Sequence, residues 1–314
     1  MTPSQTAAEA IRPYIIETPL LRAPWLETGT DCTVLLKWEH RQITGSFKRR
    51  GAANKLLSLS PEQRAAGIVT ASTGNHAFGV SSMGKELGIS TEVFVSHTIN
   101  PEKIERITGY GAKIRQIPGA HLAAEEAARA EASRTGRTYV APYNDLQVVA
   151  GQGTLAVELL LQEPALDAVF VTAGGGGLIS GIGAHLQSGS PSTEVVGCWP
   201  VNSRVLYECL RAGQIISFPE QDTYSSSSAG NVEQGSVTFA LAQQVIGPRV
   251  LVTETEILGA LRRLYQEIGL VVEGAAGVAV ASFLKTAERY RGKTVAILLC
   301  GGNVDPVLTA LIQA

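Results

Sequence analysis

A single lysine stands where its amine could act as a nucleophile. Lys48 follows the small residues of 44–46 and begins a helical pattern that we expect over 47–57. A helix dipole disfavours positive charge in the first turn, so an ammonium group there loses its proton more readily. The neutral amine can then attack a carbonyl group. The alternative is an ordinary solvated lysine, and two further stretches of the chain argue against it.

The stretch 72–76 has the residue types of a carboxylate site. It reads Ser-Thr-Gly-Asn-His, follows the apolar run 67–71 and opens a helical pattern that we expect over 77–87. Hydroxyl groups such as those of Ser72 and Thr73, together with bare backbone amides at a helix N-terminus, can bind a carboxylate.

Four consecutive glycines form a candidate phosphate site. They are Gly174, Gly175, Gly176 and Gly177, between an expected strand and an expected helix. Such a run costs conformational order and packs no side chain, but it lets several amides converge on one anion. A flexible loop is the alternative, although connections between a strand and the next helix are usually short.

The elements that must position these residues alternate along the chain. We expect strands at 34–39, 68–71, 92–96, 113–116, 139–141, 168–172, 194–198, 250–253 and 295–299. We expect helices at 7–14, 47–57, 77–87, 101–110, 121–135, 178–186, 204–212, 254–268 and 275–290, and one that ends near 161. This alternation predicts an α/β fold with a parallel sheet and helices on its faces. The irregular stretch 218–236, with its serine run 225–228, falls inside the series, so we expect a loop near the site.

The composition narrows the class of protein. The chain has 314 residues and a net charge of −2, which indicates neither a nucleic-acid nor an acidic-membrane partner. Apolar runs are too short to span a bilayer, and we expect no signal peptide. The four cysteines lack the paired spacing of a zinc site or a disulfide framework, so we expect reduced thiols in a cytoplasmic protein.

Three motifs carry a resemblance to a known family. The Ser-Phe-Lys run at 46–48, the 72–76 loop and the glycine run are similar in order and spacing to those of the pyridoxal-phosphate-dependent serine/threonine dehydratases. The likeness extends from Glu-Thr-Pro-Leu, starting at residue 17, to Cys-Gly-Gly-Asn, ending at residue 303. It implies the tryptophan synthase β-like fold, with two open parallel-rich α/β domains and pyridoxal 5'-phosphate in the cleft. Residues 1–66 and 145–314 would form the large cofactor-binding domain, and 67–144 the small mobile domain.

The resemblance assigns roles around the cofactor. Lys48 would form the resting Schiff base and, once freed by substrate, act as the base at Cα. Phe47 would pack against the cofactor ring, although it is equally compatible with a core position. The amides of the glycine run would bind the phosphate, which in this family is thought to protonate the departing hydroxyl group. Asn75 would hydrogen-bond the 3'-oxygen of the cofactor.

The same resemblance assigns the substrate side and the ring nitrogen. Ser72, Thr73 and the amides around Gly74 would bind the substrate carboxylate; His76 belongs to this loop, but we expect it to be structural. Cys300 would face the pyridine nitrogen as a neutral thiol, which makes the ring a weaker electron sink and favours elimination; a buried small hydrophobe is the alternative. Glu273 matches a glutamate near the ring, although a glutamate at a helix N-terminus is also ordinary.

Three departures from the family affect the interpretation. Relatives that bind a divalent cation use a glutamate and an aspartate where this chain has Trp199 and Val205, so we expect no metal. A loop that often reads Ala-Asp-Gly is Ser-Ser-Ser at 225–227, which leaves the substrate preference open. Thr73 occupies the position of the second proton-transfer serine of serine racemase.

We therefore expect a homodimeric lyase that converts a β-hydroxy amino acid into a 2-keto acid and ammonia. An amino-acid racemase is the nearest alternative. A dehydratase of a hydroxyectoine-derived amino acid is another, because 39–48 and 228–233 look nearest to the hydroxyectoine-utilisation enzymes. β-Replacement enzymes usually lack the histidine after asparagine. A nicotinamide or flavin dehydrogenase does not fit, because Ile179 stands at the third position of G-x-G-x-x-G. Lys48 and two intact anion loops argue against a non-catalytic binding protein.

Overall fold

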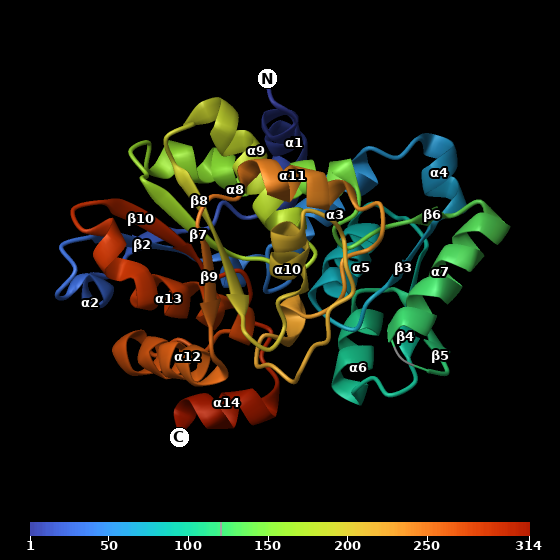
Figure 1. Cartoon of the computed structure of the whole chain (residues 1–314). Helices are drawn as coiled ribbons and strands as arrows, with labels where there is room; N and C mark the ends of the chain where they lie inside the picture. The colour runs from blue at the N-terminus through green and yellow to red at the C-terminus, as the bar shows by residue number, and fades with distance from the viewer. Residues whose placement is uncertain (120) are drawn as a thin grey trace.

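A computed structural model describes residues 1–119 and 121–314, and its strands form two sheets (Figure 1). The strands are β1 Leu20–Arg22, β2 Thr33–Lys37, β3 Ile68–Ala71, β4 Thr91–Ser96, β5 Lys113–Ile117, β6 Thr138–Tyr139, β7 Ala168–Thr172, β8 Glu194–Pro200, β9 Arg249–Val252 and β10 Thr294–Leu298. The larger sheet has the order β1-β2-β10-β7-β8-β9, and the smaller one β5-β4-β3-β6. The β1–β2 pairing is antiparallel and the other ladders of these sheets are parallel.

Helices cover both sheets and fill the space between them. They are α1 Pro3–Ile11, α2 Pro24–Glu27, α3 Lys48–Leu57, α4 Pro61–Ala66, α5 Asn75–Glu86, α6 Pro101–Gly109, α7 His121–Thr135, α8 Leu146–Gln162, α9 Gly177–Gly189, α10 Val205–Ala212, α11 Val237–Val245, α12 Glu254–Ile268, α13 Gly274–Thr286 and α14 Pro306–Gln313. In Figure 1, β7 to β10 lie on the left, β3 to β5 lie on the right, and α3 and α5 lie between them. Within the described part, none of the helices is long and apolar enough to cross a membrane.

The predicted α/β fold with parallel-rich sheets is confirmed. Strands that are covered on both faces are rich in apolar residues, as β7 is, and all five residues of β7 and all six of β4 are buried. One apolar cluster includes residues of α12 and α13, and another includes residues of α8 and α9, with both drawing on the strands of the larger sheet.

The smaller sheet takes its strands from one continuous part of the chain. Its four strands lie within residues 68–139, whereas the larger sheet uses strands before and after that part. The chain leaves the larger sheet after β2 and returns at β7. The division into domains of 67–144 and of 1–66 with 145–314 stays a prediction.

Two close approaches of backbone bring the site elements together. A Cβ atom at Gly79 of α5 would lie 3.1 Å from the carbonyl carbon of Lys48, so α5 can pack directly on the start of α3. A Cβ atom at Gly181 of α9 would lie 2.3 Å from the carbonyl oxygen of Val149 in α8. The glycines therefore let α8, α9, α3 and α5 pack close around one centre.

A buried ionic cluster ties α3 to its neighbours just beyond Lys48. Arg50 donates to both carboxylate oxygens of Glu39, at 2.9 and 2.8 Å, and to Glu158 Oε1 at 2.6 Å. Lys37 Nζ completes the cluster at 2.7 Å from Glu158 Oε2. Burial alone would raise the pKa of Glu39, but Arg50 more than offsets this and holds it below its ordinary value. The cluster joins β2 and the turn after it to α3 and α8.

Candidate active site

Lys48 is the first residue of α3, and its amine lies inside a cavity. Its Nζ donates to the carbonyl oxygen of Pro142 at 2.9 Å and lies 5.2 Å from the centre of the Phe47 ring. Burial lowers the pKa of Lys48 to about 8, although the Glu273 carboxylate and Cys300 oppose the shift. A substantial fraction of this amine is therefore neutral near physiological pH.

The loop that carries Lys48 is fixed against the segment after β10. The Phe47 amide donates to the Cys300 carbonyl at 3.1 Å, and the Gly302 amide donates to the Gly45 carbonyl at 2.9 Å. Gly45 has a φ of +76°, a conformation that glycine adopts without strain. Cys300 thus lies next to the loop that carries Lys48, and both residues line the same cavity.

The glycine run forms a tight turn between β7 and the N-terminus of α9. A Cβ atom at Gly174 would lie 2.6 Å from the Ser228 carbonyl oxygen, and one at Gly175 would lie 2.4 Å from the Tyr143 ring. Gly176 has a φ of +87° and caps α9. These positions require glycine, and the positive end of the α9 dipole faces this turn.

The cavity brings these features together. The described residues that line it are Phe47, Lys48, Asn75, Tyr143, Thr172, Ala173, Gly174, Gly175, Gly176, Gly177, Leu178, Ile179, Ser227, Ser228, Glu273, Ala275 and Cys300. It therefore contains an amine with a lowered pKa, a glycine cradle at a helix N-terminus, a carboxylate and a thiol.

Glu273 is buried at the end of the cavity near Cys300. Its Oε2 accepts from the Asn75 amide at 2.9 Å, and its Oε1 accepts from the Ser227 hydroxyl at 2.9 Å. Burial raises the pKa of Glu273, while the hydrogen bonds from Asn75 and Ser227 oppose the shift. Cys300 Sγ lies 3.8 Å from Glu273 Oε1, and burial raises its pKa well above the ordinary value. The thiol is therefore neutral at physiological pH.

Known proteins are similar to this chain over almost its whole length. A family model described as "Pyridoxal-phosphate dependent enzyme" matches residues 11–301. The catabolic L-threonine dehydratase of Staphylococcus aureus is 37% identical over 309 residues, which cover 96% of this chain and 88% of that protein. This chain belongs to the pyridoxal-phosphate-dependent enzyme family. It is a lyase whose cofactor is pyridoxal 5'-phosphate.

Two solved structures confirm the tryptophan synthase β-like fold of the enzyme. Threonine deaminase isoform 2 of Solanum lycopersicum is 28% identical with a TM-score of 0.93, over 98% of this chain and 91% of that one. Serine racemase of Dictyostelium discoideum is 31% identical with a TM-score of 0.90, over 96% and 98%. Both a dehydratase and a racemase therefore share the architecture.

The cavity fits the cofactor that the family uses. The Gly174–Gly177 backbone sits at a helix N-terminus where added side chains would clash, which suits a phosphate bound by amides. The Lys48 amine, with its lowered pKa, suits the aldehyde. The buried thiol of Cys300 suits a pyridine nitrogen that carries no added charge.

Only part of the stretch 72–76 lines the cavity. Asn75 lines the cavity, whereas Ser72, Thr73 and Gly74 are half-buried beside it at the start of α5. The Gly74 amide donates to Ser72 Oγ at 3.2 Å. The buried His76 ring lies 3.0 Å from the Val140 carbonyl oxygen and is not among the residues that line the cavity. The binding roles of this stretch stay predictions.

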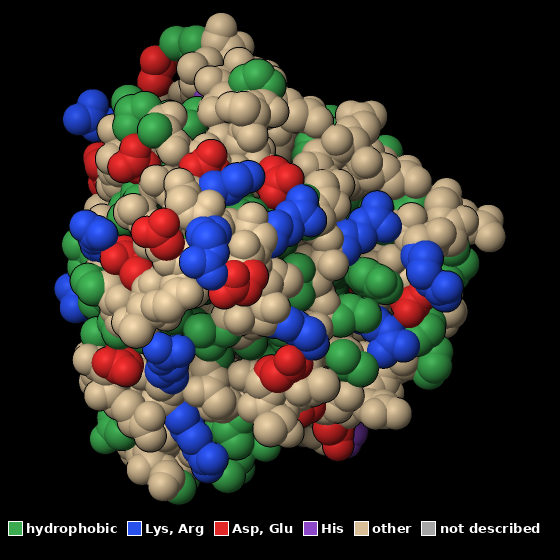
Figure 2. All heavy atoms as spheres, turned by 60° about the vertical axis from the view of Figure 1, so that its left-hand side comes forward, with side chains coloured by type: hydrophobic (Ala, Val, Ile, Leu, Met, Phe, Trp, Pro, Cys, Tyr) green, Lys and Arg blue, Asp and Glu red, His purple; other side chains and the backbone are tan. Residues whose placement is uncertain are grey.

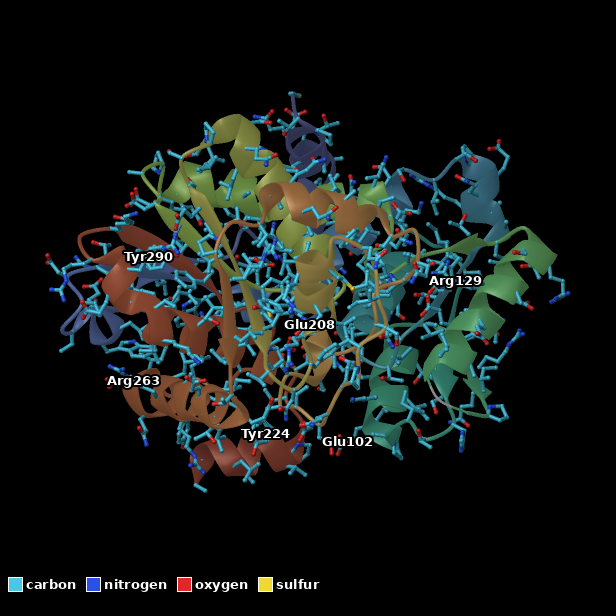
Figure 3. All side chains as sticks on the ribbon, in the orientation of Figure 1. Glu102, Arg129, Glu208, Tyr224, Arg263 and Tyr290 are labelled. Carbon is cyan, nitrogen blue, oxygen red and sulfur yellow. The ribbon has the colours of Figure 1, made fainter. Side chains whose placement is uncertain are left out.

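The irregular stretch expected near the site does lie there, and Arg129 and Tyr143 both contact it. Ser227 and Ser228 line the cavity. Arg129 of α7, labelled in Figure 3, pairs with Glu233 at 2.9 Å. The Tyr143 hydroxyl accepts from the Glu233 amide at 3.0 Å. Tyr143 was missed as a site residue, because it comes close to the glycines only in the folded chain.

The two positions at which metal-binding relatives carry a glutamate and an aspartate hold apolar core residues here. Trp199 and Val205 are buried, and Trp199 packs edge-on against Tyr207 at 5.7 Å between ring centres. Among residues 1–119 and 121–314, no group of three or more His, Cys, Asp or Glu side chains could hold a metal ion. The absence of a bound metal stays a prediction.

Proposed function

We propose that the enzyme is a dehydratase that removes water and then ammonia from a small β-hydroxy amino acid, leaving a 2-keto acid. The observation that carries this proposal is the Lys48 amine, partly neutral and placed in one cavity with the glycine cradle and the Cys300 thiol. The similarity to threonine dehydratases over almost the whole chain supports the same reaction class.

Each group of the chain has one task in this reaction. Pyridoxal phosphate, when bound, supplies the electron sink for negative charge at the substrate Cα. Lys48 takes the Cα proton, because its lowered pKa leaves a neutral amine available. The amides of Gly174–Gly177 bind and orient the phosphate.

Other residues bind the substrate carboxylate and contact the nitrogen of the cofactor ring. Ser72, Thr73 and the Gly74 amide bind the substrate carboxylate at the start of α5. Cys300, a neutral thiol, leaves the ring nitrogen without a charged partner. With no charged group beside that nitrogen, the bound cofactor would be a weaker electron sink, which would favour elimination over racemisation.

The charge of the cavity favours a substrate with a neutral side chain. Of the described residues that line it, Lys48 is the one cation and Glu273 the one carboxylate. Lys48 is committed to the Cα proton, and the pocket offers no second cation for a β-carboxylate. We therefore propose serine- and threonine-like substrates ahead of 3-hydroxyaspartate.

A screen of keto-acid release tests this proposal. The compounds are serine, threonine, phenylserine, 3-hydroxyaspartate and hydroxyectoine-derived amino acids, each at matched concentration. We expect a higher kcat/KM for a neutral side chain than for 3-hydroxyaspartate. The reverse order would contradict the proposed substrate class, and release of keto acid from none of them would contradict the dehydratase itself.

An amino-acid racemase is the second candidate, supported by the structural similarity to serine racemase. Racemisation requires an acid on the face of Cα opposite to Lys48. Thr73 is the hydroxyl residue proposed for that face, and its methyl group restricts χ1. Thr73→Ser would therefore raise any racemised product, whereas a dehydratase keeps most of its rate in Thr73→Ala.

A further inference from the structure

Helix α6 reaches across to the loop after β10 through one arginine. Arg106 Nη1 donates to Asn303 Oδ1 at 2.7 Å, and its Nη2 donates to the Thr44 carbonyl oxygen at 3.2 Å. The guanidinium carbon lies 4.2 Å from the centre of the Phe78 ring, which supports it from α5. Figure 1 shows α6 on the side of the smaller sheet that faces the centre of the molecule.

The hydrogen bonds continue from Asn303 into the cavity. Asn303 Nδ2 donates to the Thr44 carbonyl at 3.0 Å and to Asn75 Oδ1 at 2.5 Å. The Asn75 amide in turn donates to Glu273 Oε2 at 2.9 Å. A continuous relay thus joins α6 to two residues that line the cavity.

The arginine sets the direction of this relay. A guanidinium group can only donate, so the Asn303 oxygen must face Arg106. The Asn303 nitrogen then faces Asn75 Oδ1, and the Asn75 nitrogen faces the Glu273 carboxylate. Rotation of either amide by 180° would place a donor against a donor, or an oxygen against the carboxylate.

The hydrogen-bond partners of Arg106 are neutral oxygen atoms, those of the Asn303 side chain and the Thr44 carbonyl group. Within residues 1–119 and 121–314, the structure gives it no carboxylate partner, whereas Arg49, Arg115 and Arg129 all pair with glutamates. A charged donor is also a stronger hydrogen-bond donor to an amide oxygen than a neutral one. These contacts therefore indicate that Arg106 orients the amide groups and does not serve as one half of a surface ion pair.

We propose that Arg106 is a positioning residue, which fixes the orientation of Asn75 and Glu273 and so couples the docking of α6 to the reactivity of the site. The effect on turnover rests on the proposed function, but the docking of α6 and the orientation of the two residues toward the cofactor do not. When α6 moves away from Asn303, the side-chain amides of Asn303 and Asn75 are free to rotate, and Asn75 and Glu273 no longer keep one orientation in the cavity.

The test compares three single arginine variants with the parent enzyme, together with Asn303→Ala alone and combined with Arg106→Met. Arg106→Met keeps packing on Phe78 but removes the donors, and Arg106→Lys keeps the charge with a single donor group. Arg115→Met is the matched control, because Arg115 lies 4.9 Å over the Phe94 ring and pairs with Glu92 outside the relay. The readouts are kcat and KM, the visible absorbance spectrum of the bound cofactor, and hydrogen exchange of the cofactor-free protein.

We expect Arg106→Met to lower kcat roughly tenfold or more with a smaller change in KM, because a small misplacement in a site has a large effect on rate. It should shift the cofactor spectrum and speed exchange in 101–109 and 300–303, with partial recovery in Arg106→Lys. Adding Asn303→Ala to Arg106→Met should cause little further loss.

The proposal fails if Arg106→Met matches Arg115→Met in the cofactor spectrum and in exchange. It also fails if the Asn303 and Arg106 effects on kcat simply multiply. Should the parent enzyme release no keto acid, the dehydratase proposal fails, and the spectrum and the exchange still decide the role of Arg106.

Discussion

At the scale of single residues, the account depends on the protonation of Lys48. Burial disfavours its charged form, and the Glu273 carboxylate and Cys300 only partly compensate, so its pKa is lowered to about 8. An amine with this pKa captures an aldehyde far more readily at neutral pH than an ordinary lysine does. The same property makes it a competent base.

This predicts a pH dependence for cofactor uptake. Protonated amine cannot attack, so the rate at which cofactor-free protein takes up pyridoxal phosphate should rise with pH through about 8 and level off above it. Stopped-flow absorbance at constant ionic strength measures this rate. A midpoint near the ordinary value of 10.5 would contradict the lowered pKa.

Lys48→Ala should leave a folded protein that has neither the visible absorbance of the bound cofactor nor turnover. Lys113→Ala, at an exposed position of β5, is the matched control and should keep both. Covalent retention of the cofactor by Lys48→Ala after borohydride reduction would identify another lysine as the anchor.

At the scale of elements, the turn between β7 and α9 tolerates side chains poorly in place of its glycines. A Cβ atom at Gly175 would meet the Tyr143 ring at 2.4 Å. Gly259, in the exposed middle of α12, has no atom within 4 Å of an added Cβ among the described residues. Replacing Gly175 by alanine therefore tests the effect of a steric clash. Replacing Gly259 by alanine tests the effect of restricting the backbone where there is room for the side chain.

Gly175→Ala should cost about 1–3 kcal/mol by overpacking and should weaken cofactor binding. Gly259→Ala should instead raise the free energy of unfolding by about 0.5–1 kcal/mol, because alanine is the better helix former. Cofactor titration and urea unfolding of the cofactor-free proteins measure both. Unchanged cofactor affinity in Gly175→Ala would show that the turn is looser than described.

Sequence reasoning captured the elements with strong patterns and missed those that tertiary contacts define. The strands expected at 92–96 and 168–172 are present as β4 and β7. Helix α4 was missed, although Ser60 and Gln63 form a capping box that the sequence displays. Tyr143 could not be found in this way, because its neighbours in the site are far away in sequence and no local pattern marks it. Asn303 lies in the Cys-Gly-Gly-Asn motif, but its contacts with Asn75 and Arg106 arise only in the folded chain.

At the scale of the whole molecule, the ionic cluster around Arg50 joins parts that are distant in sequence. Glu39 and Glu158 both pair with this guanidinium group, Glu158 also pairs with Lys37, and the side chains of Arg50 and the two glutamates are largely buried. On the face shown in Figure 2, by contrast, lysine and arginine are interspersed with aspartate and glutamate at the surface. Exposed pairs of that kind contribute little to stability.

Arg50→Met should therefore lower the free energy of unfolding by about 3–5 kcal/mol, because it removes the ion-pair partner of the buried Glu39 and one of the two partners of Glu158. Arg291→Met, which removes an exposed pair with Glu288, should cause no measurable change. Urea unfolding of the cofactor-free proteins provides the comparison. Equal free energies of unfolding of the two variants would show that the buried cluster contributes no more to stability than an exposed ion pair.

The central claim is that elimination dominates over racemisation, and one time course tests it most directly. The parent enzyme is incubated with L-serine, and keto acid, ammonia and both enantiomers of the remaining serine are measured together. We predict keto acid and ammonia in equal amounts, formed faster than D-serine, with much of that rate kept in Thr73→Ala. Formation of D-serine faster than keto acid, abolished by Thr73→Ala, would show that the enzyme is a racemase.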